Sequence, residues 1–135
     1  IPEARKMIGV EAKATPNNLV YPLLESYADF YQLFLNENSA EYKLVYPAFE
    51  QRIQLLEAGP KQSPYHLYSI ALGHLHKSLI AIRFNKNFEA ALDFRKAFLL
   101  FKENKKSNKG NCSKKDASYI CHNNVLKVFV GYLQI

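Results

Sequence analysis

The sequence is poor in the residues on which several classes of protein depend. It contains two cysteines in 135 residues, which excludes a small fold held together by many disulfides. Its five glycines are far apart, so no glycine-rich phosphate-binding loop is present. No apolar run approaches the roughly 18 residues of a membrane-spanning helix. The motifs G-x-S-x-G and H-E-x-x-H are also absent, and we therefore expect neither an enzyme nor a bound cofactor.

The positive charge of the chain is concentrated towards its C-terminal end. Residues 1–101 carry 11 Lys and Arg against 10 Asp and Glu, whereas residues 102–135 carry 7 Lys against 2 acids. The body of the chain thus lacks the spread-out basic face that is typical of nucleic-acid binding. Only 4 of the cations are Arg, the residue best suited to bidentate contacts with phosphates and bases. We therefore expect nucleic acid to be an unlikely main partner.

Hydrophobic residues make up 48% of the chain, and they recur at steps of three and four residues, which is typical of helices. No useful alternating run predicts a strand. The length agrees with one domain at a prior of about 150 residues per domain. The pattern predicts an all-α fold of about five to six helices, arranged as antiparallel pairs joined by short turns.

The helix boundaries follow from capping residues and prolines. We expect Asn17 or Asn18 to cap a second helix that runs to about Asn36, and Asn38 or Ser39 to cap a third that ends near Ala58. Pro47 interrupts the third segment, either as a kink or as a boundary between two helices. The apolar stripe expected to face the core from the second helix contains Leu23, Leu24, Tyr27, Phe30, Tyr31 and Phe34.

The chain beyond Pro60 is predicted to divide into two regions. A fourth helix opens at Ser63-Pro64, and a fifth runs from Phe88 to about Asn104, which completes a helical domain over residues 1–104. Residues 105–135 are expected to form a second region. It contains most of a polar, basic connector over the segment Lys102 to Lys115, followed by the apolar stretch Val125 to Leu133. That stretch could form a helix or a strand; its valines favour a strand, but a lone strand has nothing to pair with, so we expect a helix.

The fourth and fifth helices resemble a tetratricopeptide repeat of a divergent kind. The fifth contains Ala90-x3-Phe94 followed by the small residue Ala97, and the fourth contains a Leu72-Gly73 step. Small residues at such positions let helix axes approach, and the aromatic ring fills the remaining space.

A wider resemblance links residues 16–100 to the N-terminal part of bacterial tetratricopeptide-like proteins of the cell envelope. It rests on the segments Pro16-Asn17-Asn18, Leu24 to Phe30, Gln51-Arg52-Ile53, Leu55 to Gly59, Ser63-Pro64-Tyr65, Leu67-Tyr68-Ser69 and Ala97 to Leu100. The resemblance implies a segment of a helical solenoid, a location in the periplasm or cell envelope, and binding of protein partners. A solenoid end without a polar cap would also tend to self-associate.

The function that we favour from the sequence is a non-enzymatic helical-repeat scaffold for protein–protein interaction. In such a scaffold the first helices of each pair line a concave surface that binds a peptide or a partner domain. We expect the binding positions to be the polar and aromatic residues that the core stripe of the fourth helix leaves exposed, namely Tyr65, Tyr68, His76 and Arg83. The alternative is a small helical module that binds nucleic acid or an anionic surface through the lysines of the segment Lys102–Lys115, above all Lys105, Lys106 and Lys109.

Other candidate chemistry is weakly supported. Cys112, Cys121 and His122 lack the close cysteine pairs of structural zinc sites, so a zinc site, a disulfide and unpaired thiols all remain open, and no metal site is predicted. His66, His74 and His76 are expected to be surface or groove histidines. The acids spaced four residues apart on helices are expected to lie on solvated faces; they are Glu25, Asp29, Glu89 and Asp93.

Overall fold

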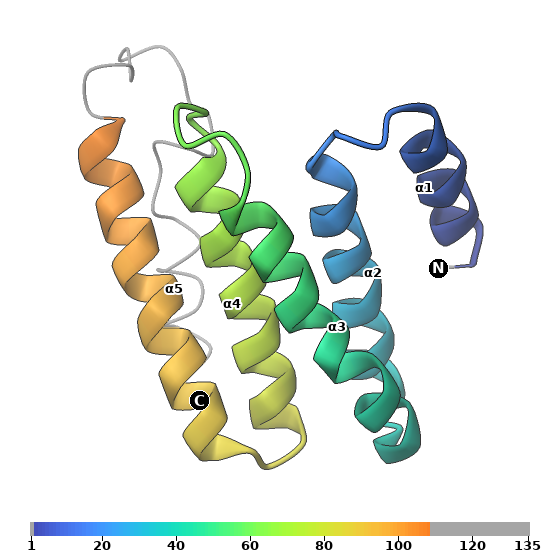
Figure 1. The fold of residues 1–135 in the computed structure, drawn as a ribbon. Coiled ribbons are helices and arrows are strands. Elements are labelled where there is room, and N and C mark those ends of the chain that lie inside the picture. Colours follow the sequence, from blue (N-terminus) through green and yellow to red (C-terminus); the bar gives the residue numbers. More distant parts are fainter. Residues whose placement is uncertain (1, 109–135) are drawn as a thin grey trace, which may run out of the picture.

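The computed structural model describes residues 2–108, which form five α-helices and no strand within that range (Figure 1). The all-α prediction is therefore confirmed. In chain order the helices are α1 (Pro2–Ala14), α2 (Val20–Asn36), α3 (Ser39–Glu57), α4 (His66–Arg83) and α5 (Asn87–Ser107).

One of the two predicted asparagine caps is present. Asn38 caps α3, whereas the N-cap of α2 is Leu19 without a side-chain cap bond, so the prediction that Asn17 or Asn18 caps this helix is wrong. The Oδ1 of Asn38 accepts hydrogen bonds from the backbone N–H groups of Ala40 and Glu41, at 2.9 and 3.1 Å. The Oδ1 of Asn18, one residue before the N-cap of α2, accepts from the N–H of Val20 at 3.1 Å. Pro47 lies inside α3, which is one continuous helix from Ser39 to Glu57. Of the two readings of Pro47, a boundary between helices is therefore wrong.

α4 is the central helix, because it packs against α2, α3 and α5. Figure 1 shows α5 and α1 at the two edges of the row of helices, with α4 between α5 and α3. Burial on several sides explains why ten α4 residues are buried: Ile70, Ala71, Leu72, Gly73, His74, Leu75, His76, Ser78, Ile80 and Ala81.

Small residues let α4 approach its neighbours closely. A Cβ atom added to Gly73 would lie 2.8 Å from the Cγ1 of Ile53 on α3. The buried hydroxyl of Ser78 donates a hydrogen bond to the carbonyl of Ala90 on α5, at 2.9 Å. The core is thus built around α4, and α3 and α5 pack on it through side chains as well as close backbone approach.

The predicted core stripe of α2 is only partly correct. Leu24, Tyr31 and Phe34 are exposed, and the fully buried positions of this helix are Ser26, Ala28, Asp29 and Leu33. The physical reason is that α2 buries a polar edge. Asp29 receives Arg5 of α1 on its Oδ1 and Arg52 of α3 on its Oδ2, each at 2.5 Å. A buried carboxylate satisfied in this way replaces the apolar contacts that periodicity predicts.

α5 extends three residues beyond the predicted end at Asn104, so the start of the expected connector is helical. The extension is held by Asn108, whose side-chain amide donates to the carbonyl of Asn104 at 3.2 Å and to that of Pro64 at 3.4 Å. Lys105 and Lys106 consequently sit on the last turn of a helix. The predicted boundary between residues 104 and 105 falls inside that helix, and the segment Val125–Leu133 lies outside the described residues.

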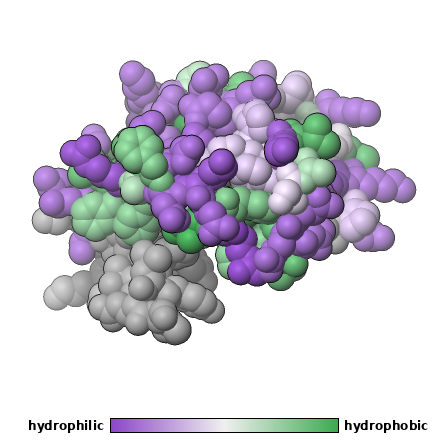
Figure 2. All heavy atoms as spheres, turned by 90° about the horizontal axis from the view of Figure 1, so that it is seen from below, coloured by the Kyte–Doolittle hydropathy of each residue, from purple (hydrophilic) through white to green (hydrophobic). Residues whose placement is uncertain are grey.

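The described surface mixes hydrophilic and apolar side chains, as Figure 2 shows for the face seen from below. The most exposed large hydrophobic residues are distributed over several helices. They include Met7 on α1, Leu35 on α2, Leu44 on α3 and Phe88 on α5. Within residues 2–108, no helix is both long and apolar enough to cross a membrane.

Candidate functional site

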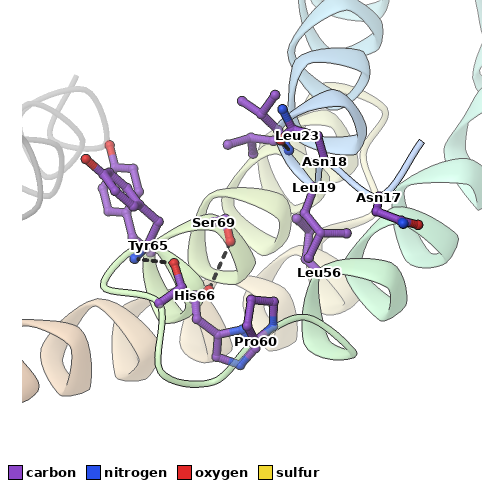
Figure 3. A pocket seen from close by; sticks show the side chains of 12 residues that line it. Asn17, Asn18, Leu19, Leu23, Leu56, Pro60, Tyr65, His66 and Ser69 are labelled. Atoms are coloured by element: carbon purple, nitrogen blue, oxygen red, sulfur yellow. Dashed lines mark hydrogen bonds between the residues drawn. The ribbon is translucent and has the colours of Figure 1, made fainter. Parts of the chain in front are cut away.

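A groove of about 500 Å³ opens where the start of α2, the end of α3 and the start of α4 meet. Figure 3 shows the groove, with Leu19, Leu23 and Leu56 clustered on one side and Tyr65 on the other. Its twelve lining residues are Asn17, Asn18, Leu19, Val20, Leu23, Leu56, Pro60, Ser63, Tyr65, His66, Tyr68 and Ser69.

The apolar wall of the groove continues into the core. Leu19 packs against the buried cluster formed by Ile53, Leu56 and Ile70. Its position depends on Gly59, since a Cβ atom added there would lie 2.3 Å from the Cδ1 of Leu19. The glycine that ends the third helical segment thereby leaves room for one wall of the groove.

The rim of the groove is polar, and the part of it formed by residues 2–108 contains no Asp, Glu, Lys or Arg. The hydroxyl of Ser69 donates to the carbonyl of His66 at 3.0 Å, and the hydroxyl of Ser63 accepts from the N–H of Tyr65 at 3.3 Å. The amides of Asn17 and Asn18 are exposed at the connection between α1 and α2. The arrangement suits an uncharged apolar group flanked by hydrogen-bonding atoms.

Two of the four predicted binding residues line this groove. Tyr65 is 59% exposed, and the ring of Tyr68 packs edge-on against Phe101 at 5.7 Å between centroids. Arg83 lies at the opposite end of α4, about 27 Å along the helix from Tyr65 at 1.5 Å per residue. There its guanidinium forms an ion pair with Glu37 and lies 5.3 Å from the centroid of the Phe34 ring. The four residues therefore do not form one surface.

His76, the fourth predicted binding residue, is buried, so the expectation that it is exposed is wrong. Its Nδ1 lies 3.1 Å from the hydroxyl of Ser26, and its ring packs against Tyr27 and Phe30, with centroids 4.3 and 5.0 Å away. Burial lowers the pKa of His76 to about 4, so the ring is neutral at pH 7. Sequence reasoning assumed that a polar residue beside the apolar stripe faces water, but α2 covers this side of α4.

A second buried polar cluster joins α4 to α5 and α3. The Nδ1 of His74 lies 2.8 Å from the Oδ1 of Asp93, and the Nζ of Lys77 lies 3.2 Å from its Oδ2 and 2.5 Å from the Oε2 of Glu50. Burial alone would raise the pKa of Asp93, but the bonds from His74 and Lys77 outweigh it and hold that pKa below its usual range. The expectations of a surface His74 and of solvated Asp29 and Asp93 are therefore wrong.

These clusters have a clear structural role. Ser26–His76 ties α2 to α4, and His74–Asp93 ties α4 to α5. All four residues are buried, at 1 to 4% exposure, so no substrate reaches them in this conformation. Among residues 2–108, no group of three or more His, Cys, Asp or Glu has a geometry that would hold a metal ion.

The remaining candidates from the sequence lie near or beyond the end of α5. Lys105 and Lys106 are exposed on the last turn of α5. Lys109, Cys112, Cys121 and His122 lie outside the described residues. The residues that sequence reasoning missed are the α1–α2 connection and Leu19. The signals were Asn17-Asn18 and Gly59-Pro60, which were interpreted only as helix ends.

Comparison of the chain with protein-family models, with curated proteins and with solved structures finds no match.

Proposed function

We propose that the chain is a non-enzymatic helical scaffold that binds a protein partner, and that it does so by taking an apolar side chain of an extended segment into the groove at the start of α4. The observation that supports this function is the groove itself, which has an apolar wall and, among the described residues, no Asp, Glu, Lys or Arg in its lining. Its volume of about 500 Å³ lies within the range of about 300–1,000 Å³ that is usual for ligand sites.

The composition of the rim favours a peptide segment as ligand. Asn17, Asn18 and Ser63 contribute amide and hydroxyl groups to the lining, and groups of this kind can pair with the main-chain N–H and C=O groups of a bound segment. Tyr65 presents a largely exposed aromatic ring beside them, and tyrosine suits partly wet interfaces because it is apolar on its faces and polar at its tip. The resemblance to tetratricopeptide repeats points to the same class of partner.

The experiment is selection of a random displayed-peptide library on the full chain, followed by fluorescence-polarisation measurement of the selected peptides. Val20→Arg places a charge at the groove on a residue that is 44% exposed, so the fold should tolerate it. We expect this variant and Tyr65→Ala each to weaken binding by about tenfold or more, because a desolvated charge or a lost aromatic contact costs more than 1 kcal/mol.

Two controls keep the test specific. Leu44→Arg makes the same kind of change on α3, at a residue that is 81% exposed and does not line the groove. Arg83→Gln removes a cation at the other end of α4. Both variants should bind the selected peptides as the wild type does. Peptides that bind all variants equally well, or a failure to select any peptide, would contradict the proposed function.

The anion-binding alternative keeps one specific observation in its favour. Lys102, Lys105 and Lys106 are all exposed on the last two turns of α5. If this segment binds phosphates, affinity for a fluorescent oligonucleotide or for vesicles with anionic headgroups should fall steeply with salt. The variant with Lys105→Gln and Lys106→Gln should then lose binding, and an unchanged affinity would discard the alternative.

A further inference from the structure

The face of α5 that points away from the core carries a regular apolar and charged stripe. On the opposite side of the helix, Ala90, Ala97 and Phe101 are buried against α4. Outward, Phe88 is 75% exposed, Leu92 49% and Leu99 50%. Among the described helices, α5 packs mainly against α4 and stands at the edge of the row in Figure 1, so residues 2–108 leave this face uncovered.

The spacing along this face is that of a coiled-coil seam. Phe88, Leu92, Arg95 and Leu99 follow one another at steps of four, three and four residues, which places them on one line of the helix surface. Flanking them on one side are Ala91 and Phe98, and on the other side are Glu89 and Lys96, in the positions that border a seam in a two-helix pair.

We propose that this face binds a second copy of the chain, with the two α5 helices antiparallel and related by a two-fold axis. In an antiparallel pair, the register that sets Phe88 opposite Leu99 of the second copy also sets Leu92 opposite Arg95 of that copy. Symmetry repeats both contacts, so every layer of the seam contains at least one apolar side chain. The long methylene stem of Arg95 covers Leu92 while its guanidinium reaches water.

The flanking residues are complementary in the same register. On one side, the large ring of Phe98, which is 45% exposed, meets the small side chain of Ala91 from the second copy. On the other side, Glu89 comes within reach of Lys96 of the second copy, and symmetry forms this ion pair twice. Antiparallel helices also place the positive end of each helix dipole beside the negative end of the other.

Among the remaining charges, Lys102 lies far from its symmetry mate. In this register, Lys102 and its symmetry mate are separated by 17 residues of helix, or about 25 Å at 1.5 Å per residue, which exceeds the Debye length of about 8 Å at physiological salt. The two basic ends therefore project from opposite ends of the pair. Arg95 and its symmetry mate are only three residues apart along the axis, or about 4.5 Å at 1.5 Å per residue, so both guanidinium groups must reach water for the pair to form. Charge complementarity at Glu89 and Lys96, rather than apolar area alone, selects the second copy as occupant.

The test is sedimentation velocity of the full chain over a micromolar to millimolar concentration series. We expect a reversible monomer–dimer equilibrium. Leu99→Asp should raise the dissociation constant by more than about tenfold, since it desolvates a carboxylate in the seam. Leu44→Asp, the same change at an exposed leucine of α3, should leave it unchanged, and circular dichroism should show equal helicity for both variants.

Charge exchange tests the register. Glu89→Lys and Lys96→Glu should each raise the dissociation constant by about threefold to tenfold, because each creates two like-charge contacts across the axis. The double variant restores opposite charges and should return the constant close to that of the wild type. A chain that is monomeric at all concentrations, a dimer indifferent to Leu99→Asp, or a double variant as weak as the single ones would overturn the proposal. The outcome is independent of peptide binding, because no residue of this face lines the groove.

Discussion

Gly73 and Ile53 mark a close approach of α4 to α3, since a single added Cβ atom at the glycine would stand 2.8 Å from the Cγ1 of the isoleucine. Ile53 is 1% exposed and, as a β-branched residue in a helix, has one strongly preferred χ1 rotamer. It therefore has little freedom to move aside. Glycine in the middle of a helix is less favourable than alanine, but at this position the packing against Ile53 leaves no room for a Cβ atom.

Gly73→Ala should destabilise the fold by about 1–3 kcal/mol, the usual cost of overpacking, although alanine is the better helix former. The measurement is urea unfolding followed by circular dichroism. Gly9→Ala provides a matched control on α1, where an added Cβ atom meets nothing within 4 Å. That variant should be stabilised by up to about 1 kcal/mol. If both variants change stability in the same direction, the close approach of α3 and α4 is wrong.

Stability should fall in mild acid because of His76. Its pKa is about 4 in the folded chain and 6.5 in the unfolded chain, so the unfolded state binds a proton first as the pH falls. The contribution of His76 is complete above pH 6.5 and is lost between about pH 6.5 and pH 4. The loss amounts to as much as about 3 kcal/mol at 1.36 kcal/mol per pKa unit.

Unfolding free energies at neutral pH and near pH 4.5 measure this effect. In His76→Gln the amide has no proton to gain, so the dependence on pH should become shallower. His66→Gln makes the same substitution at the first residue of α4, which is only partly buried, and is the matched control. Identical pH profiles for the wild type and His76→Gln would contradict the buried neutral state of His76.

Asp93 should contribute to stability through its charge. Asp93→Asn preserves the shape of the side chain but removes the carboxylate partner of His74 and leaves Lys77 paired with Glu50 alone, so we expect a loss of about 2 kcal/mol. Because the pKa of Asp93 is lower in the folded chain than in the unfolded chain, its carboxylate stabilises the fold fully at pH values above the unfolded pKa. This stabilisation is lost as the pH falls through the folded pKa. Glu103→Gln on the same helix is exposed and should change stability by less than about 0.5 kcal/mol. Equal effects of the two substitutions would rule out the cluster.

The cap of α3 offers a fourth prediction. Asn38→Ala removes the acceptor for two backbone N–H groups and should cost about 1 kcal/mol. Asn36→Ala, two residues away on an exposed side chain at the end of α2, is the control and should be nearly neutral. Thermal unfolding of the pair gives the difference directly.

Local chemistry predicted the start of α3, since Asn38 caps it as expected. It was less accurate at the other ends, because the N-cap of α2 is Leu19, α4 begins at His66 rather than at Ser63-Pro64, and Gly59 does not adopt the positive φ of a glycine that ends a helix. The burial of α4 could not be predicted in the same way. The apolar stripe of α4 predicts that one face of this helix is buried. In the structure α2, α3 and α5 cover α4 on several sides, so His74 and His76 are buried as well.

Only one side of the candidate groove could be predicted from the sequence, because the other side depends on how the helices pack. Tyr65 and Tyr68 stand near the start of α4, where the sequence marks an exposed helix end, and both line the groove. The opposite wall comes from Leu19, whose position depends on a contact with the third helix that no local pattern encodes. Arg83 shares a helix with the tyrosines but lies about five turns away, at 3.6 residues per turn.

The central position of α4 has a consequence for synthesis of the chain. Residues 2–57 leave the ribosome before α4 does. At that stage Ile53 and Leu56 lack the helix that covers them, and Ser26 has not yet met a histidine that lies 50 residues further along. α1 to α3 therefore cannot complete their core during translation until α4 has emerged. The nascent chain therefore exposes apolar surface after α3 has emerged and before α4 has. In this interval of elongation it offers the largest apolar surface to a chaperone.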